Sequence, residues 1–597
     1  MRNAETVLGV LRERGRRGLP VERVYRQLFN PELYLLAYGR IYSNQGAMTP
    51  GVTPETADGM SMGTIESIID AMRHERYRFV PVRRTYIRKQ SGGLRPLGLP
   101  TWSDKLVGEA VRLLLEAYYE PQFSDRSHGF RSGRGCHSAL REVANTWTGT
   151  TWFIEGDISD CFGSLDHDIM IRILSEKIHD NRFLRLIRNM LEAGYLEDWT
   201  WNATLSGAPQ GGVVSPILSN IYLDKLDEFV DTVLIPDYTR GKHRANNRAY
   251  REMWNALMRA RRRGDRAQVR ALRRRMRTVP SGDLNDPGYR RLRYTRYADD
   301  HLLGFIGPKA EAEEIKDRLA AFLREQLKLE LSAQKTLITH ARTGAARYLG
   351  YDISVWHCDS KVTRGQRATR RSINGHIVLR VPDEVIKAKC APYLRRGRPE
   401  RRPALLNLDD YQIVQIYGAE YRGIVQYYLL AYDVWRLNRL RWTAETSMLK
   451  TLANKHRSTV SKMAARHRAK IETPNGLRRC FEARRHRDGR QPLVARFGEV
   501  PLVRQKDAMP VDRVPVQITY PRKELVHRLL AGRCELCQRL DVVQVHQVRK
   551  LADLATSGPG QPEWSEVMTR MRRKTLVVCA SCHALIHNGK PTATRTA

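Results

Sequence analysis

Two adjacent aspartates interrupt an apolar segment near the middle of the chain. The segment reads RYTRYADDHLLGF, with Asp299 and Asp300 between runs of β-forming residues. This pattern predicts two strands joined by a tight acidic turn, with both carboxylates at its tip. Adjacent carboxylates repel each other, so in apolar surroundings they need a cation, and hard oxygen ligands suit Mg²⁺ bound together with substrate phosphates. Ordinary hairpin-turn aspartates are the simpler alternative.

A third carboxylate follows another strand-like run. The sequence TWFIEGDISDCFGSLDH predicts an apolar strand that ends at Asp157, with Phe162 five residues beyond it. Asp157, Asp299 and Asp300 are then expected at the ends of neighbouring strands, which would suit two metal ions acting in a displacement at phosphorus. Taken alone, Asp157 reads as a helix N-cap or a turn residue, and the three carboxylates together, in a chain of this charge, favour the metal site.

The charge balance indicates the class of partner. The 597 residues include 102 Lys and Arg against 64 Asp and Glu, which gives a formal net charge of +38. Such an excess predicts binding to a polyphosphate, either RNA or DNA. An anionic membrane is the alternative. The sequence has no apolar run of about 18 residues and no signal-like start, so we expect no membrane partner.

Length and pattern predict several domains. A chain this long predicts roughly three to five of them. A basic insert at 239–292 reads as two helices broken near Gly264, which either contact nucleic acid or form a solvated hairpin. Five regions follow one another along the chain: a basic leader (1–30), a mixed helix and strand region (31–365), an aromatic helical region (366–480), a basic linker (481–523) and a Cys/His-rich unit (524–597).

Four of the nine cysteines form two Cys-x-x-Cys pairs near the C-terminus. The pairs are CELC, with Cys534 and Cys537, and CASC, with Cys579 and Cys582. Four thiolates in this spacing predict a closed, tetrahedral structural Zn²⁺ site in a reducing compartment. Reduced cysteines in a small core are the alternative.

Several long motifs resemble one family. The segments YADD, EGDISDCFGSLDH and GAPQGGVVSPILSNIYL together resemble a reverse transcriptase, and more narrowly the reverse transcriptase and maturase encoded by a group II intron. The segments NQGAMTPGV, LRPLGLPTWSDKLV, HGFRSGRGCHSAL and EYRGIVQYY extend the resemblance over nearly the whole chain.

The resemblance implies an α+β multidomain fold. It assigns right-hand polymerase fingers and palm, with an antiparallel sheet, to 31–365. It assigns an α-helical thumb or maturase domain to 366–480, a DNA-binding linker to 481–523, and a small zinc-bound HNH endonuclease domain of the ββα-metal type to 524–597.

The resemblance also implies roles for individual residues of the polymerase. Asp157, Asp299 and Asp300 would hold two Mg²⁺ ions, and Phe162 would reject a ribose 2′-OH. Lys89 and Arg95 would lie over the triphosphate of the incoming dNTP, and Pro209, Gln210 and Gly211 would lie along the templating pair. Lys335 would protonate the leaving pyrophosphate, with simple phosphate contact as the alternative.

The resemblance implies that the aromatic helical region binds structured intron RNA. Most of its aromatic side chains are predicted to be core. Its cationic side chains are expected to form a surface that grips phosphate: Arg422, Arg436, Arg439, Arg441, Lys450, Lys455, His456 and Arg457.

Three histidines in the Cys/His-rich unit resemble an HNH nuclease site. His583 and His587 are four apart on a predicted helix, and with His546 they would hold a second divalent metal. By this mapping Gln547 replaces the general base, and an amide cannot take a proton near neutral pH. The unit therefore reads either as a working nickase, or as a DNA-binding module that nicks poorly, or as a zinc fold that its histidines cap.

Together these features predict a ribonucleoprotein with intron RNA that assists splicing and inserts the intron into target DNA by target-primed reverse transcription. The expected location is a bacterial cytoplasm, in association with the nucleoid. Three other functions are the alternatives. The first is a splicing-only maturase or other non-catalytic RNA-binding splicing factor, and the second is a non-mobile reverse transcriptase used in defence or diversification. The third is an RNA-dependent RNA polymerase. The three carboxylates argue against the first, the maturase-like and HNH regions against the second, and Phe162 against the third.

Overall fold

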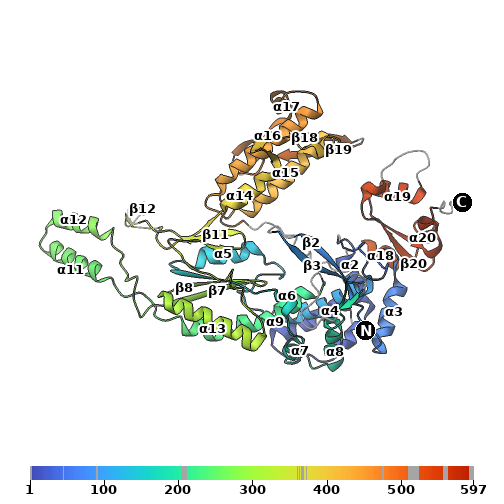
Figure 1. The fold of residues 1–597 in the computed structure, drawn as a ribbon, viewed down its shortest axis with the longest axis horizontal. Helices are drawn as coiled ribbons and strands as arrows, with labels where there is room; N and C mark the ends of the chain where they lie inside the picture. Colours follow the sequence, from blue (N-terminus) through green and yellow to red (C-terminus); the bar gives the residue numbers. More distant parts are fainter. Residues whose placement is uncertain are drawn as a thin grey trace.

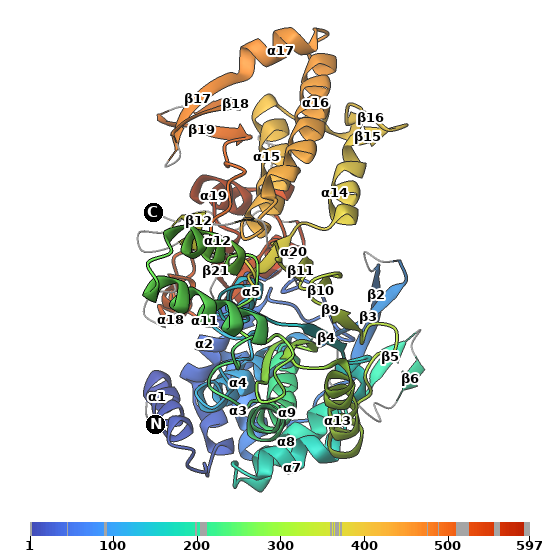
Figure 2. The same ribbon diagram turned by 90° about the vertical axis from the view of Figure 1, so that its left-hand side faces the viewer.

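The chain folds into parts arranged around a central sheet. The computed structural model describes residues 3–44, 46–88, 92–197, 200–202, 212–358, 361, 363–364, 369–370, 373–473, 476–487, 489–508, 524–554 and 562–589. A helical part stands above the central sheet, a helical hairpin projects at one end, and the C-terminal unit lies at the other end beside the N-terminal helices (Figure 1). The view at right angles shows the same upright helical part (Figure 2).

The central, palm sheet has four antiparallel strands in the order β7-β8-β4-β9. These are β7 (Arg291–Tyr297), β8 (Asp300–Ile306), β4 (Trp152–Asp157) and β9 (Ile338–His340). Tyr297 pairs with Asp300 across the β7–β8 turn, so only Ala298 and Asp299 form the loop. The acidic hairpin predicted from the sequence is confirmed.

Side chains of the palm strands alternate between two cores. Ile154 and Leu303 join the core shared with the fingers, whereas Phe153 and Leu302 join the core shared with the thumb. This follows from the two-residue period of a strand. Helices α9 (Ser215–Phe229) and α13 (Lys309–Leu327) contribute to the first core, and α5 (Cys136–Thr146) contributes to the second.

The fingers combine a second sheet with a helical layer. Strands β3 (Leu94–Leu99), β2 (Val82–Arg88), β5 (Tyr195–Glu197) and β6 (Thr200–Asn202) form the sheet in that order. The helices are α1 (Ala4–Arg16), α2 (Pro31–Ile41), α3 (Met62–Arg73), α4 (Trp102–Tyr119), α7 (His167–Ser175) and α8 (Asn181–Leu191).

The basic leader is part of this layer rather than a separate element. A Cβ at Gly15 would lie 2.0 Å from the Tyr118 carbonyl oxygen, so α1 touches the backbone of α4. Leu11, Val21 and Tyr25 are buried in the common core.

The thumb consists of four helices and two three-stranded sheets. Its helices are α14 (Asp383–Cys390), α15 (Asp410–Tyr427), α16 (Asn438–Lys455) and α17 (Val460–His467). The first sheet, of β10 (Ala346–Tyr348), β11 (Tyr351–Val355) and β14 (Ile377–Arg380), connects the helices to the palm, and the second consists of β17 (Arg468–Thr473), β18 (Gly476–Arg487) and β19 (Arg490–Phe497). A Cβ at Gly418 would lie 2.1 Å from the Arg496 carbonyl oxygen, so β19 packs directly on α15.

The β17–β19 sheet shows that the predicted boundary between thumb and linker at residue 481 is wrong. The sequence places a basic linker or extended arm from residue 481, but β18 runs across that position and β19 packs on the thumb. The high arginine content hides the strand pattern, in which buried Phe481, Ala483 and Ala495 alternate with exposed or half-buried charged residues. Residues 509–523 of the predicted linker lie outside the described residues.

The basic insert forms the projecting hairpin of Figure 1. Helices α11 (Arg248–Arg262) and α12 (Arg266–Met276) flank Gly264, which has a φ of +72°. The predicted pair of helices broken at this glycine is therefore confirmed.

The C-terminal unit has the ββα arrangement expected of an HNH domain. Strands β20 (Val543–Gln547) and β21 (Thr575–Cys579) are followed by α20 (Ala580–His587), with α18 (Glu524–Leu530) and α19 (Glu563–Met571) beside them. A short strand of the fingers, β1 (Met60–Ser61), adds to its sheet in the order β1-β20-β21. No helix among the described parts of the chain is long and apolar enough to cross a bilayer.

Candidate functional site

The three palm carboxylates meet at one edge of the palm sheet. Asp157, the last residue of β4, is the direct cross-strand partner of Asp300, the first residue of β8. Asp299 lies in the two-residue turn, and Ala298 before it has a φ of +56°, as tight hairpin turns require. The structure thus brings together residues that are more than 140 positions apart in the sequence.

Burial and mutual repulsion raise the pKa values of two carboxyl groups at this edge. Burial, and then the charge of Asp299, raise the pKa of Asp300 to about 7. Burial and the charge of Asp157 raise the pKa of Asp299, while the charges of Arg95 and Lys335 oppose this. The Lys335 ammonium donates to Asp157 Oδ2 at 2.7 Å, and this hydrogen bond raises the lysine pKa. The site therefore holds more carboxylate than its own cations neutralise.

A buried ion pair lies next to the acidic turn. The side chains of Arg296 and Asp227 are fully buried, and Arg296 Nη2 lies 2.5 Å from Asp227 Oδ2. The Tyr294 hydroxyl also donates to Asp227 Oδ1, at 2.8 Å. The Arg296 guanidinium donates at 2.9 Å to the carbonyl of Ala298, the residue before Asp299. Sequence reasoning missed this pair, because only the fold brings α9 beneath the turn.

Packing behind the site requires a glycine. A Cβ at Gly156, next to Asp157, would lie 1.9 Å from Nε2 of His301. His301 is 1% exposed, and burial lowers its pKa to about 4, so the imidazole is neutral at pH 7. The Gly156–Asp157 order in EGD is a signal that could have indicated this close approach.

Two other predicted polymerase residues lie within the described part of the chain. Phe162 lies in the short helix α6 (Cys161–Ser164), with its ring centroid 6.2 Å from that of the exposed Phe130. Arg95 lies exposed on β3 and is close enough for its charge to act on Asp299. The remaining predicted positions, Lys89, Pro209, Gln210 and Gly211, lie outside the described residues.

The thumb uses much of its predicted cationic surface internally. His456 and Lys455 contact Asp410, Arg422 pairs with Glu499, and Arg436 pairs with Asp433 and Asp383. Lys450 donates to the Pro399 carbonyl at 2.7 Å. These side chains therefore stabilise the thumb. As expected, most of its tyrosines pack in or against the core, whereas Trp435 is 65% exposed.

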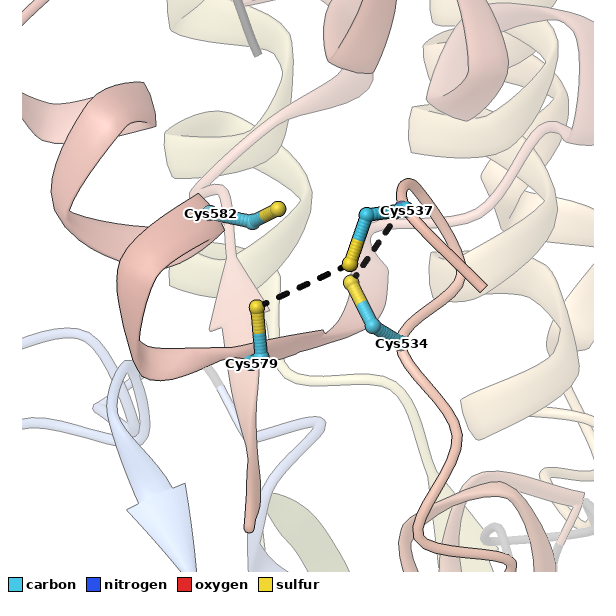
Figure 3. Close-up of side chains that lie close together, drawn as sticks. All are labelled: Cys534, Cys537, Cys579 and Cys582. Carbon is cyan, nitrogen blue, oxygen red and sulfur yellow. Dashed lines mark hydrogen bonds between the residues drawn. The ribbon is translucent and has the colours of Figure 1, made fainter. Parts of the chain in front are cut away.

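The four paired cysteines point toward one another (Figure 3). Their sulfur atoms lie within 4.8 Å of one another, and Cys537 Sγ is 3.8 Å from Cys579 Sγ. Burial disfavours a thiolate at Cys534, but backbone N–H groups of Cys579 and Cys537 outweigh it and lower its pKa. The predicted grouping of these cysteines is confirmed, and the four sulfur atoms could hold a metal ion.

The three predicted histidines form a second cluster in the same unit. His546 lies on β20, and His583 and His587 lie one turn apart on α20. Asp58 of the fingers joins them, and one ligand atom from each residue lies within 4.8 Å of the others. Sequence reasoning missed Asp58 because nothing local links it to the HNH unit.

Gln547, at the position of the expected general base, faces the fingers. Its side-chain amide donates to the Tyr42 carbonyl at 2.9 Å, and its backbone N–H donates to Asp58 Oδ1 at 2.7 Å. An open groove of about 1000 Å³ adjoins it, between the fingers and the HNH unit. Five basic side chains line this groove: Arg528, Arg549, Lys550, Arg573 and Lys574.

Three family models match successive parts of the chain. Residues 87–353 match reverse transcriptase (RNA-dependent DNA polymerase), and residues 379–480 match type II intron maturase. Residues 534–583 match the AI2M/AI1M-like HNH endonuclease. The first match spans the palm and the later part of the fingers, the second contains helices α14 to α17 of the thumb, and the third contains strands β20 and β21.

Curated relatives match nearly end to end. The chain is 38% identical over 591 residues to the group II intron-encoded protein LtrA of Lactococcus lactis subsp. cremoris, covering 95% of this chain and 96% of that protein. It is 34% identical to a 91 kDa protein in the cob intron of Schizosaccharomyces pombe, covering 95% of this chain and 69% of that protein. It is 31% identical to the putative COX1/OXI3 intron 1 protein of Saccharomyces cerevisiae, covering 94% of this chain and 68% of that protein. With an acidic palm, a maturase thumb and an HNH unit matched in this order, the chain belongs to the family of group II intron-encoded reverse transcriptases and maturases with an HNH endonuclease domain.

Proposed function

We propose that the palm edge copies intron RNA into DNA with Asp157, Asp299 and Asp300 as the ligands of two Mg²⁺ ions. The observation that carries this proposal is the cross-strand pairing of Asp157 with Asp300 beside Asp299, in a site with surplus buried carboxylate. The oxygen donor set fits Mg²⁺. When bound, the ions would neutralise charge that develops on the phosphates of the primer end and of the dNTP.

The surrounding side chains have separate roles in this proposal. Arg95 adds positive charge at the triphosphate, as does Lys89. The raised pKa of Lys335 keeps its Nζ protonated, so it can donate a proton to the leaving pyrophosphate. Phe162 excludes a ribose 2′-OH by contact. Pro209, Gln210 and Gly211 support the templating base pair.

An Asp299→Asn variant tests the polymerase assignment. We expect loss of dNTP incorporation on an RNA template, with intron RNA binding kept because the substitution preserves shape. Asp237→Asn, at an exposed ion pair with Arg318, is the matched control. Incorporation that survives Asp299→Asn would contradict the assignment, and a preference for NTP over dNTP would contradict the role of Phe162.

We further propose that the thumb and the α11–α12 hairpin bind structured intron RNA and assist splicing. The hairpin supports this, because its arginines Arg261, Arg263 and Arg274 lie exposed, whereas many thumb cations are already paired. Phosphate contacts release counterions, so affinity should fall steeply with salt. Replacing these three arginines with Gln should reduce the slope of log K against log salt by about two to three.

The C-terminal unit is proposed to hold structural Zn²⁺ at Cys534, Cys537, Cys579 and Cys582, and to bind and nick target DNA. His546, His583 and His587 are the proposed nuclease metal ligands. The basic groove between the fingers and the HNH unit supports contact with a DNA backbone. Nicking would provide the primer for reverse transcription at the target.

A nicking-deficient, DNA-binding unit is the second candidate, and Gln547 favours it. Wild type, His583→Ala and Gln547→His should be compared as ribonucleoproteins on end-labelled target duplex with Mg²⁺. Nicking by wild type, lost in His583→Ala, supports the nickase. If only Gln547→His nicks the duplex, the wild-type unit lacks a general base. Reverse transcription would then need a primer that this protein does not make.

The proposed location follows from the proposed partners. A ribonucleoprotein that inserts into chromosomal DNA has to reach it, which places the complex at the nucleoid of a bacterial cytoplasm. The organism of the Lactococcus relative is consistent with this.

A further inference from the structure

The fingers and the HNH unit share both a sheet and a core. The Gly59 N–H donates to the Val545 carbonyl at 2.8 Å, and β1 continues the pairing with Met60 opposite Val545. Leu525 and Val577 of the HNH unit belong to the same hydrophobic cluster as the fingers helices. The unit is therefore docked on the fingers by more than surface contacts.

This docking places a fingers carboxylate among the three histidines. Asp58 Oδ1 lies 3.2 Å from His546 Nδ1 and 3.2 Å from His583 Nε2, and Oδ2 lies 2.8 Å from His587 Nε2. The Asp58 side chain is 14% exposed, and only His587 of the four is more than half exposed. Gly59 has a φ of +81°, which allows the chain to turn between this contact and β1.

The ring nitrogens of the buried His546 lack well-formed hydrogen bonds. His546 is 5% exposed, and neither ring nitrogen makes a hydrogen bond of acceptable geometry, although Nδ1 faces Asp58. A buried polar group without such a partner is costly. A metal ion would satisfy one of these nitrogens, and it would also separate His583 Nε2 from His587 Nε2, which are 3.3 Å apart.

Three imidazoles and one carboxylate supply four ligand atoms, the number that fills a closed tetrahedral site. Structural metal sites are closed by four protein ligands, whereas catalytic sites leave one position for water or substrate. We propose that Asp58 of the fingers is the fourth ligand of the HNH metal. The ion then links the HNH unit to the fingers, a link that we call the clasp. While the clasp is closed, the metal has no free coordination position for DNA. This inference rests on the HNH metal site of the proposed function.

The neighbouring contacts agree with such a clasp. Gln547 is bound to Asp58 through its backbone and to Tyr42 through its side chain. The residue at the general-base position is therefore also directed into the fingers. Separation would free the fourth position and Gln547 together.

The test uses the full-length protein with intron RNA and measures metal binding directly. The Zn²⁺ affinity of the second site, which His546, His583, His587 and Asp58 form, is determined by chelator competition in wild type, Asp58→Ala, Asp58→Asn and His583→Ala. Asp70→Asn, an exposed aspartate on α3 of the same fingers layer, is the control. Loss of the Asp58 carboxylate should weaken the second site by at least the roughly 10- to 100-fold that loss of an outer-shell partner costs.

Amide exchange reports the clasp independently of catalysis. In wild type, adding Zn²⁺ should slow exchange in peptides that contain Gly59 and Gln547, and this effect should vanish in Asp58→Ala and shrink in Asp58→Asn. With metal at saturation, Asp58→Ala should nick target duplex faster than wild type.

The outcomes separate the two proposals. Wild-type metal affinity in Asp58→Ala, or exchange that is insensitive to metal in wild type, overturns the role of Asp58. If His583→Ala also leaves the second site unchanged, the HNH metal site of the proposed function fails as well. Metal loss in His583→Ala but not in the Asp58 variants overturns the clasp alone.

Discussion

The buried ion pair beneath the acidic turn gives a demanding test of the palm. Asp227→Asn keeps the shape of the side chain but removes the hydrogen-bonded counterion of Arg296, whose side chain is fully buried. Breaking a buried ion pair by removing one partner costs about 3–5 kcal/mol. Because Arg296 also donates to the Ala298 carbonyl, the cost should fall on the hairpin that carries Asp299 and Asp300.

Hydrogen exchange of the β7–β8 hairpin measures this cost locally. Since about 1.4 kcal/mol corresponds to a factor of ten, the peptide 291–306 should exchange roughly 10²- to 10⁴-fold faster in Asp227→Asn. Asp237→Asn is the control, because its partner Arg318 is 35% exposed and such pairs contribute about 0–1 kcal/mol. Equal effects of the two substitutions would refute the support role.

A double variant distinguishes support from simple stability. Replacing both partners, as Asp227→Leu with Arg296→Met, should recover much of the lost stability, because apolar residues of similar volume often replace a buried pair without loss. The Ala298 carbonyl would still lack its donor, so dNTP incorporation should remain low. Recovery of both stability and incorporation would show that the turn does not need Arg296.

Three further predictions concern packing, pH and metal. Gly156→Ala should abolish dNTP incorporation, since its Cβ would lie 1.9 Å from His301 Nε2. Gly423→Ala should not, because its Cβ would meet nothing within 4 Å beyond its chain neighbours and the backbone of its own helix. Burial and the charge of Asp227 raise the pKa of Asp224 to about 7. The Asp224 carboxyl therefore binds its proton more tightly in the native state than in the unfolded chain. Consequently the free energy of unfolding decreases as the pH rises from about 4 to 7. Asp224→Asn should therefore stabilise the chain by roughly 2 to 4 kcal/mol at pH 8 and by nothing near pH 3.5, as denaturant midpoints at the two pH values would reveal. Cys582→Ser should lower bound Zn²⁺ by one equivalent in metal analysis, whereas Cys480→Ser, at a buried cysteine outside the cluster, should not.

The palm site could be predicted because its signals are local. Asp299 and Asp300 stand in one short hairpin and Asp157 ends a short apolar strand, so each strand end could be predicted from its own segment. The common site could be inferred only by taking the three carboxylates together. The two Cys-x-x-Cys pairs are equally local, and the structure gathers them as expected.

Features that depend on distant contacts could not be predicted. Asp58 and Gln547 are 489 residues apart, so no pattern near either one indicates their contact. The thumb cations were expected on an open surface, but a sequence does not indicate which of them meet Asp410 or Glu499. Arginine-rich β18 and β19 read as a linker because their apolar positions are few.

The sheet that joins the two ends of the chain has a consequence for synthesis. β1 leaves the ribosome long before β20, and at about 5–20 residues per second the 489 residues between Asp58 and Gln547 take roughly 25 to 100 seconds to make. During that time the nascent fingers expose an unpaired strand edge, which is a site for unwanted pairing with another chain. The HNH unit therefore completes a sheet that begins in the fingers, and a ribosome that stalls before residue 543 leaves β1 without its partner strand.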